Sequence, residues 1–176
     1  MKINNYCLKF KKFKYVFLLV FLLPVSIGLT ACNEDDEGPG ISLNGPIISV
    51  SDFTGNWIAT NAAFRSNSSP VQRVDVIDEG GSVTFVAQAD GRFTISVNIP
   101  NRTADIFSGK LGFNEEEYAS RLIVIFDGDA PDNYELFTIE LINSDSELLL
   151  SGPTTFDFDD NGSEEPASVD LRLIRN

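Results

Sequence analysis

Apolar and polar residues alternate through most of the chain after residue 52, with the period of two that is typical of β-strands. In residues 93–99, Phe, Ile, Val and Ile occupy the odd positions, and Thr, Ser and Asn occupy the even ones. Asp90-Gly91 precedes this segment and predicts a hairpin, because the dipeptide accepts the positive φ angles of tight turns. The same criteria predict eight strands at residues 55–64, 83–88, 93–99, 105–113, 121–126, 134–142, 147–151 and 168–175.

The succession of these strands predicts an all-β domain. No window keeps a helical pattern for three turns, although residues 114–118 allow one helical turn and residues 70–78 a short additional strand. Eight short strands joined by turns are typical of an antiparallel up-and-down barrel or of a sandwich. We expect the barrel, because closure removes the exposed edges that a sandwich has to protect.

The N-terminal region has the layout of a secretory signal. Four lysines precede an uninterrupted apolar run at residues 15–23, and small residues follow up to Cys32. The alternative is a transmembrane helix, but Pro24 and Gly28 interrupt the apolar stretch, which is at the short end of what a span requires. We therefore expect residues 1–31 to be a signal peptide.

The end of this signal carries a modification motif. Leu29-Thr30-Ala31-Cys32 resembles the lipobox of bacterial lipoproteins. The resemblance implies that Cys32 becomes the first mature residue and carries diacylglycerol on its sulfur and an acyl chain such as palmitate on its amine, which is enough for stable anchoring. The acidic residues 33–37 resemble the surface-export signal of Bacteroidetes lipoproteins, or are simply a solvated tether. We expect an outer-membrane protein on the cell surface.

Glycine and proline define the next segment. Residues 38–51 contain Gly38-Pro39-Gly40 and Gly45-Pro46 and show no helical period, so we predict a tether at residues 32–51 and the barrel domain at 52–176. After residue 31 there are 8 basic and 26 acidic residues, a formal charge of −18. This charge repels phosphate and argues against nucleic-acid binding.

The residue types also restrict catalysis and metal binding. Histidine is absent, and the only cysteines are Cys7 and Cys32. Histidine or cysteine zinc sites and Ser-His-Asp triads are thus excluded. No phosphate loop or oxyanion motif accompanies the carboxylates, so we do not expect an enzyme.

The first predicted strand carries a family motif. Phe53-Thr54-Gly55-Asn56-Trp57 resembles the Gly-x-Trp motif of lipocalins, and its wider Phe-x-Gly-x-Trp form resembles fatty-acid-binding proteins and bacterial lipocalin-like lipoproteins of the calycin superfamily. The resemblance implies that Trp57 closes one end of the barrel and is covered by an arginine of the last strand. Arg175 has the inward parity of that strand and would lie beside Trp57.

The barrel interior allows two interpretations. Large apolar residues fill it completely, or part of it remains open as a ligand cavity. The residues expected to form such a pocket are Phe85, Phe93, Ile95, Phe107, Phe126 and Phe137. The first interpretation gives a structural or interaction lipoprotein. The second gives a monomeric, lipid-anchored protein that binds a small apolar or amphipathic molecule, or a cell-surface partner, at its open end.

One acidic loop resembles half of a calcium site. Residues 157–162 read Asp-Phe-Asp-Asp-Asn-Gly and match the first half of an EF-hand loop, which makes Asp157, Asp159 and Asn161 candidate calcium ligands. The twelfth position is Ser168 instead of the bidentate glutamate, so we expect weak binding and no other cofactor. Strand alternation places this loop and the loop at 127–132 beside the open end of the barrel.

Overall fold

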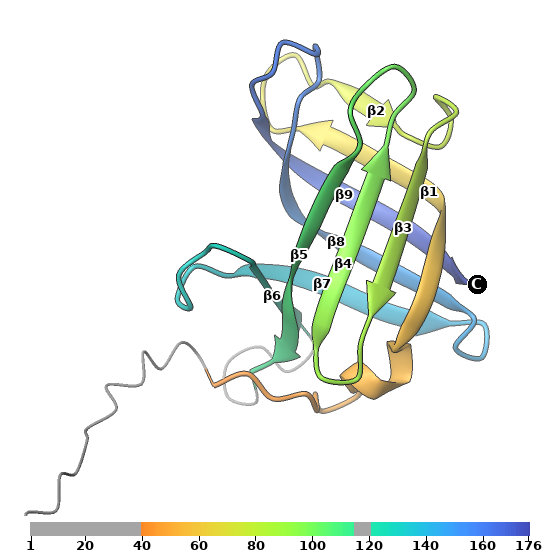
Figure 1. The fold of residues 1–176 in the computed structure, drawn as a ribbon, viewed down its shortest axis with the longest axis vertical. Helices are drawn as coiled ribbons and strands as arrows, with labels where there is room; N and C mark the ends of the chain where they lie inside the picture. The colour runs from red at the N-terminus through yellow and green to blue at the C-terminus, as the bar shows by residue number, and fades with distance from the viewer. Residues whose placement is uncertain (1–39, 115–120) are drawn as a thin grey trace, which may run out of the picture. The chain divides into compact units, whose positions relative to one another are not determined.

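The structure is a computed structural model that describes residues 40–114 and 121–176. In this part of the chain, one short 3-10 helix, η1, is followed by nine strands (Figure 1). Their bounds are η1 Val50–Phe53, β1 Gly55–Ser66, β2 Arg73–Asp75, β3 Ser82–Ala87, β4 Arg92–Asn98, β5 Asp105–Phe113, β6 Arg121–Phe126, β7 Glu135–Ile142, β8 Glu147–Phe156 and β9 Glu165–Arg175. No helix within the described ranges is long and apolar enough to cross a membrane.

Eight of the strands in the described residues form a closed antiparallel barrel. The order is β1-β3-β4-β5-β6-β7-β8-β9, and β9 pairs with β1 to close the ring. This closing register runs from Trp57 opposite Arg175 to Ser66 opposite Ala167, with one irregularity between Ala59 and Asn61. The predicted up-and-down barrel is therefore confirmed, and the sandwich is excluded.

The ninth strand lies outside the ring. β2 pairs only with β1, through three residues, and falls within the segment 70–78 that the sequence suggests as a short additional strand. The possible helical turn at 114–118 lies, from residue 115 onward, outside the described residues. So do the predicted signal peptide, Cys32 and the acidic run at 33–37.

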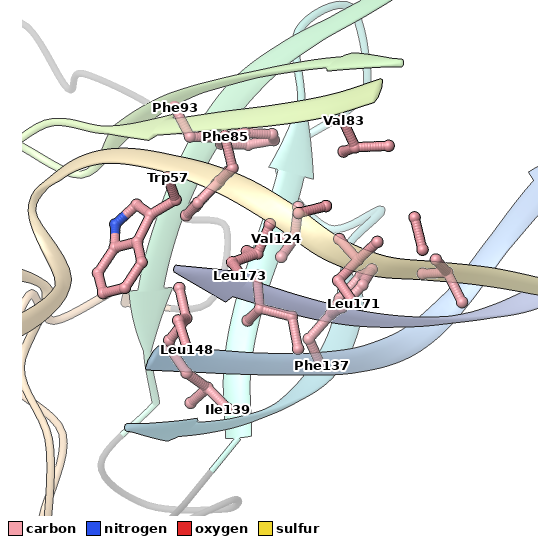
Figure 2. Packing of buried hydrophobic residues seen from close by; sticks show 14 of the residues in the cluster. Trp57, Val83, Phe85, Phe93, Val124, Phe137, Ile139, Leu148, Leu171 and Leu173 are labelled. Atoms are coloured by element: carbon pink, nitrogen blue, oxygen red, sulfur yellow. The ribbon is translucent and has the colours of Figure 1, made fainter. Parts of the chain in front are cut away.

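Period-two alternation determines which side chains enter the core. In β9, Leu171 and Leu173 are buried, while Arg172 between them and Ile174 after them are exposed. Figure 2 shows inward side chains from several strands meeting in one apolar cluster, with Trp57 at its left end. This burial drives the ring to close, because each strand contributes one apolar face.

The residues just before β1 belong to the folded body, which corrects the prediction of a tether up to residue 51. Ser42 forms a bridge with Phe113, and the backbone N–H of Val50 donates to the carbonyl of Leu43 at 2.9 Å. Val50 and Phe53 are completely buried. Apolar side chains at these positions cover the barrel end that the start of β1 forms, and Gly45-Pro46 is a folded turn within this segment.

Candidate functional site

One end of the barrel is closed by the start of β1 and the end of β9. Trp57 is fully buried, and its indole N–H donates to the carbonyl of Phe53 at 2.9 Å. The guanidinium carbon of Arg175 lies 4.4 Å from the indole centroid. Its terminal nitrogens donate to the carbonyls of Thr54 at 2.7 Å and Asp52 at 3.0 Å. Arg175 thus ties the last strand to the segment that enters the first one.

Gly55 makes this arrangement possible. Its φ angle is +139°, in a region that side chains disfavour, and a Cβ here would lie 3.0 Å from a guanidinium nitrogen of Arg175. The three residues that the sequence connects through the lipocalin motif, Gly55, Trp57 and Arg175, are therefore in mutual proximity.

The opposite end of the barrel is the mouth, which we define by the connections at residues 67–81, 99–104, 127–134 and 157–164. Strands β1, β4, β6 and β8 end there, as antiparallel alternation requires. Both acidic loops singled out in the sequence are among these connections.

A cavity of about 470 Å³ opens toward this mouth. Its wall is mainly apolar and aromatic, with polar groups at the mouth loops and strand ends. The lining residues are Phe64, Val83, Ile95, Val97, Ile99, Arg102, Asp105, Phe107, Phe126, Asp129, Glu135, Phe137, Pro153, Thr154, Thr155, Phe156, Asp157, Glu164, Val169 and Leu171.

The structure separates the six predicted pocket residues into two groups. Ile95, Phe107, Phe126 and Phe137 line the cavity. Phe85 and Phe93 do not, because they lie nearer the closed end, where their rings pack 6.2 Å apart and Phe93 meets Phe126 at 5.8 Å. Both interpretations of the interior thus apply, each to one half of the barrel: the closed half is filled, and the mouth half is hollow.

Sequence reasoning missed a second aromatic group on the far side of the cavity. Phe64 and Phe156 stack with their centroids 4.3 Å apart, and Phe158 meets Phe156 at 4.9 Å. The strand predicted for residues 147–151 is longer in the structure, where β8 continues to Phe156 and pairs with an equally extended β9. The alternation of Phe156 and Phe158 with polar residues was the available signal.

The mouth holds one lining cation, Arg102, which the sequence analysis did not select. Its guanidinium donates to the backbone carbonyl of Asp157 at 2.7 Å and lies 3.5 Å from the Asp160 carboxylate. It also lies 5.9 Å from the Phe156 ring centroid. Arg102 therefore binds the β8–β9 connection to the cavity wall.

The candidate calcium loop is organised by its own backbone. The Asp157 carboxylate accepts the N–H of Gly162 at 2.8 Å and of Asn161 at 3.2 Å. Desolvation opposes ionisation of Asp157, but backbone hydrogen bonds from Gly162, Asn161 and Asp160 outweigh it and hold its pKa below the ordinary value. Asn161 uses its side-chain oxygen to accept the N–H of Ser163 at 2.7 Å.

These contacts stabilise the turn without an ion. Asp159 is exposed, as is Asn161. Across residues 40–114 and 121–176, no three His, Cys, Asp or Glu side chains are arranged so that they could hold a metal ion. Calcium binding by Asp157, Asp159 and Asn161 stays a prediction.

The other acidic mouth loop is fixed to the wall at its first residue. Asp127 accepts the hydroxyl of Ser108 at 2.6 Å and a guanidinium nitrogen of Arg92 at 3.0 Å. The hydrogen bond from Ser108 and the charge of Arg92 hold the pKa of Asp127 below its ordinary value. This residue thus joins the end of β6 to β4 and β5.

The barrel topology, the Trp57 closure and the cavity at the opposite end define a lipocalin-like β-barrel fold. Among solved structures, the chain is similar to a lipocalin-like protein from Bacteroides uniformis ATCC 8492, with a TM-score of 0.39 and 14% identity over 71% of this chain and 99% of that one. It is also similar to lobster apocrustacyanin A1, with a TM-score of 0.37 and 13% identity over 72% and 62% of the two chains. No protein-family model and no curated protein matches the chain.

Proposed function

We propose that this protein is an outer-membrane lipoprotein, anchored through Cys32, whose barrel binds a small hydrophobic or amphipathic molecule. The observation that carries the proposal is the cavity of about 470 Å³ at the mouth. Ligand pockets typically measure roughly 300–1,000 Å³ and combine an apolar wall with a few polar groups. The hollow half of this barrel has both properties.

The position of the cavity suits an anchored binding protein. Residues 42–53 pack at the closed end, so the chain enters the barrel opposite the mouth. Anchoring through Cys32 therefore leaves the mouth accessible to a ligand from the surroundings. Surface exposure of the anchored protein, which the acidic run suggests, belongs to the same proposal.

Filling the cavity tests the proposal. Val169 lines it, whereas its neighbour Ser168 on β9 is exposed. We expect Val169→Phe to abolish binding of the neutral apolar fluorophore N-phenyl-1-naphthylamine, and Ser168→Phe to leave it unchanged. The measurement is a fluorescence titration of the full-length protein in phosphatidylcholine nanodiscs, with empty discs subtracted.

Circular dichroism of both variants is the control that checks whether they are folded. Equal binding by Val169→Phe and the wild-type protein would show that the probe binds elsewhere. No binding by the wild-type protein would favour the alternative of an interaction lipoprotein without a small ligand.

A further inference from the structure

Three carboxylates of the cavity lining lack polar partners. Asp105 begins β5, Asp129 lies in the β6–β7 connection, and Glu135 begins β7, so they follow one another around one side of the mouth. Within the described residues, none of the three side chains has a hydrogen bond or an ion pair. Asp105 and Asp129 are exposed and Glu135 is half-buried. This side of the cavity is therefore strongly negative.

The barrel wall opens at the same side. β5 pairs with β6 only from Gly109 to Phe113, so the first residues of β5 have no β6 partner within the described chain. Figure 1 shows the two strands diverging toward the mouth. At this opening Ile106 is 69% exposed and Phe107 is 38% exposed, and the Phe107 ring meets Phe126 edge-on at 6.2 Å. The opening thus combines aromatic rings with carboxylates.

The lining contains no cation that is free to neutralise this charge. Arg102 is the one basic residue of the lining, and it is engaged by the Asp157 carbonyl, the Asp160 carboxylate and the Phe156 ring. Asp105, Asp129 and Glu135 also do not form a metal-binding group, because no three His, Cys, Asp or Glu side chains of the described residues are arranged to hold an ion. A larger organic cation with an apolar part can contact both the carboxylates and the aromatic rings of Phe107 and Phe126.

We propose that the ligand of this cavity is a cationic amphipath, an apolar molecule that carries an amine or quaternary ammonium group. This inference rests on the proposed binding function and specifies its ligand class. The apolar part occupies the aromatic cavity, and the cation lies at Asp105, Asp129 and Glu135 near Phe107. A cation gains there from carboxylates and from ring faces. A carboxylate ligand of the same shape is repelled.

A matched series of probes tests the ligand class. The probes 4-phenylbutylamine and 4-phenylbutanol share the same phenylbutyl part, 4-phenylbutyrate has one methylene fewer, and the three heads are cationic, neutral and anionic. Isothermal titration calorimetry uses the full-length protein in phosphatidylcholine nanodiscs, with empty discs titrated as the blank. We expect the amine to bind about tenfold more tightly than the alcohol, and the butyrate to bind most weakly. Added salt narrows these differences.

Neutral variants test the assigned residues. The triple variant Asp105→Asn/Asp129→Asn/Glu135→Gln should bind the amine no better than the alcohol, while its affinity for the alcohol stays at the wild-type value and shows that the cavity is intact. The control Asp90→Asn/Glu140→Gln/Asp145→Asn removes the same number of charges outside the cavity lining. We expect it to retain the preference for the amine.

The outcomes separate this inference from the proposed function. Equal affinity for amine and alcohol in the wild-type protein, or an unchanged preference in the triple variant, overturns the inference and leaves cavity binding in place. Equal loss of the preference in the control variant also overturns it, because the protein's general charge would then be the cause. If none of the three probes binds, both the inference and the proposed function fail.

Discussion

Arg175 covers Trp57, with its guanidinium carbon 4.4 Å from the indole centroid, and this contact connects the last strand to the first. A cation over an indole contributes roughly 0.5–2 kcal/mol, depending on desolvation. Since β9 pairs with β1 along its length, Arg175 reinforces a closure that apolar burial drives.

Removing either partner should destabilise the barrel. We expect Trp57→Ala to lower the free energy of unfolding by about 3–5 kcal/mol, the usual loss for a buried large aromatic side chain. Arg175→Ala should cost about 1–2 kcal/mol, because it removes both the cation–π contact and the hydrogen bonds to the carbonyls of Thr54 and Asp52. Urea unfolding measures both.

Arg172→Ala is the matched control for Arg175→Ala. Arg172 lies on the same strand and contacts Glu147 at 2.6 Å on the exposed face. Exposed ion pairs contribute only about 0–1 kcal/mol, so this variant should change stability less. An equal or larger loss in Arg172→Ala would contradict a special role of Arg175.

Asp127 should give stability that depends on pH. Its pKa is lower in the folded protein than the ordinary 3.8, because Ser108 and Arg92 favour the carboxylate. Its contribution is thus complete above about pH 4 and is lost as the pH falls through the lower folded value. We expect the stability difference between wild type and Asp127→Asn to be constant near neutrality and to shrink below that point.

Urea unfolding between neutral pH and about pH 2.5 measures this difference. Asp132→Asn removes a charge from the same connection and serves as the control for general electrostatic effects. If the difference in unfolding free energy between wild type and Asp127→Asn does not depend on pH, the hydrogen bonds to Asp127 do not favour its charged form.

Calcium should stabilise the protein weakly if Asp157, Asp159 and Asn161 bind it. Without the bidentate glutamate we expect a Kd of about 10⁻⁴–10⁻³ M. At ten times that concentration the gain is roughly 1.4 kcal/mol, which raises Tm by a few degrees. Thermal unfolding in calcium and in magnesium at equal ionic strength separates specific binding from screening of the negative surface.

The double variant Asp157→Asn/Asp159→Asn is the control for this experiment and should respond equally to both ions. If calcium has no greater effect than magnesium on the wild-type protein, the hydrogen bonds from Gly162 and Asn161 are sufficient to explain the loop.

Cys32→Ala should prevent lipidation. The variant is expected to lose membrane association or to stall as an unprocessed precursor, because we propose Cys32 as the site of lipid attachment. Fractionation of cells and detergent partitioning measure the outcome, with Cys7→Ala as the control that keeps the motif. Unchanged partitioning and processing of Cys32→Ala would exclude this residue as the anchor.

Local sequence patterns were sufficient for the ring but not for its interior. Alternation places Leu171 and Leu173 in the core and gives Arg175 their parity, because a strand has a strict period of two. The same period gives Phe85 and Phe107 an inward direction without giving their depth. Of these two residues only Phe107 lines the cavity, because the position of a side chain along the barrel axis depends on how each strand pairs with its neighbours.

Two segments show where composition is a weak guide. Gly45-Pro46 suggested a tether, but tertiary contacts fold this turn against Phe113. The strand predicted to end at residue 151 continues through Gly152-Pro153, and at Gly152 a Cβ would lie 2.5 Å from the Phe137 ring, so the glycine admits that ring. In both places the residue that usually breaks regular structure allows a close approach instead.

The contrast between the filled and hollow halves of the barrel has an evolutionary consequence. Each of the long strands contributes to closure at one end and to the cavity wall at the other, as β9 does with Arg175 and Val169. Substitutions near the mouth can therefore change the shape and charge of the cavity wall while the closed end, on which folding depends, stays the same. Barrels of this architecture can therefore vary their cavities in small steps while they keep the same closed end.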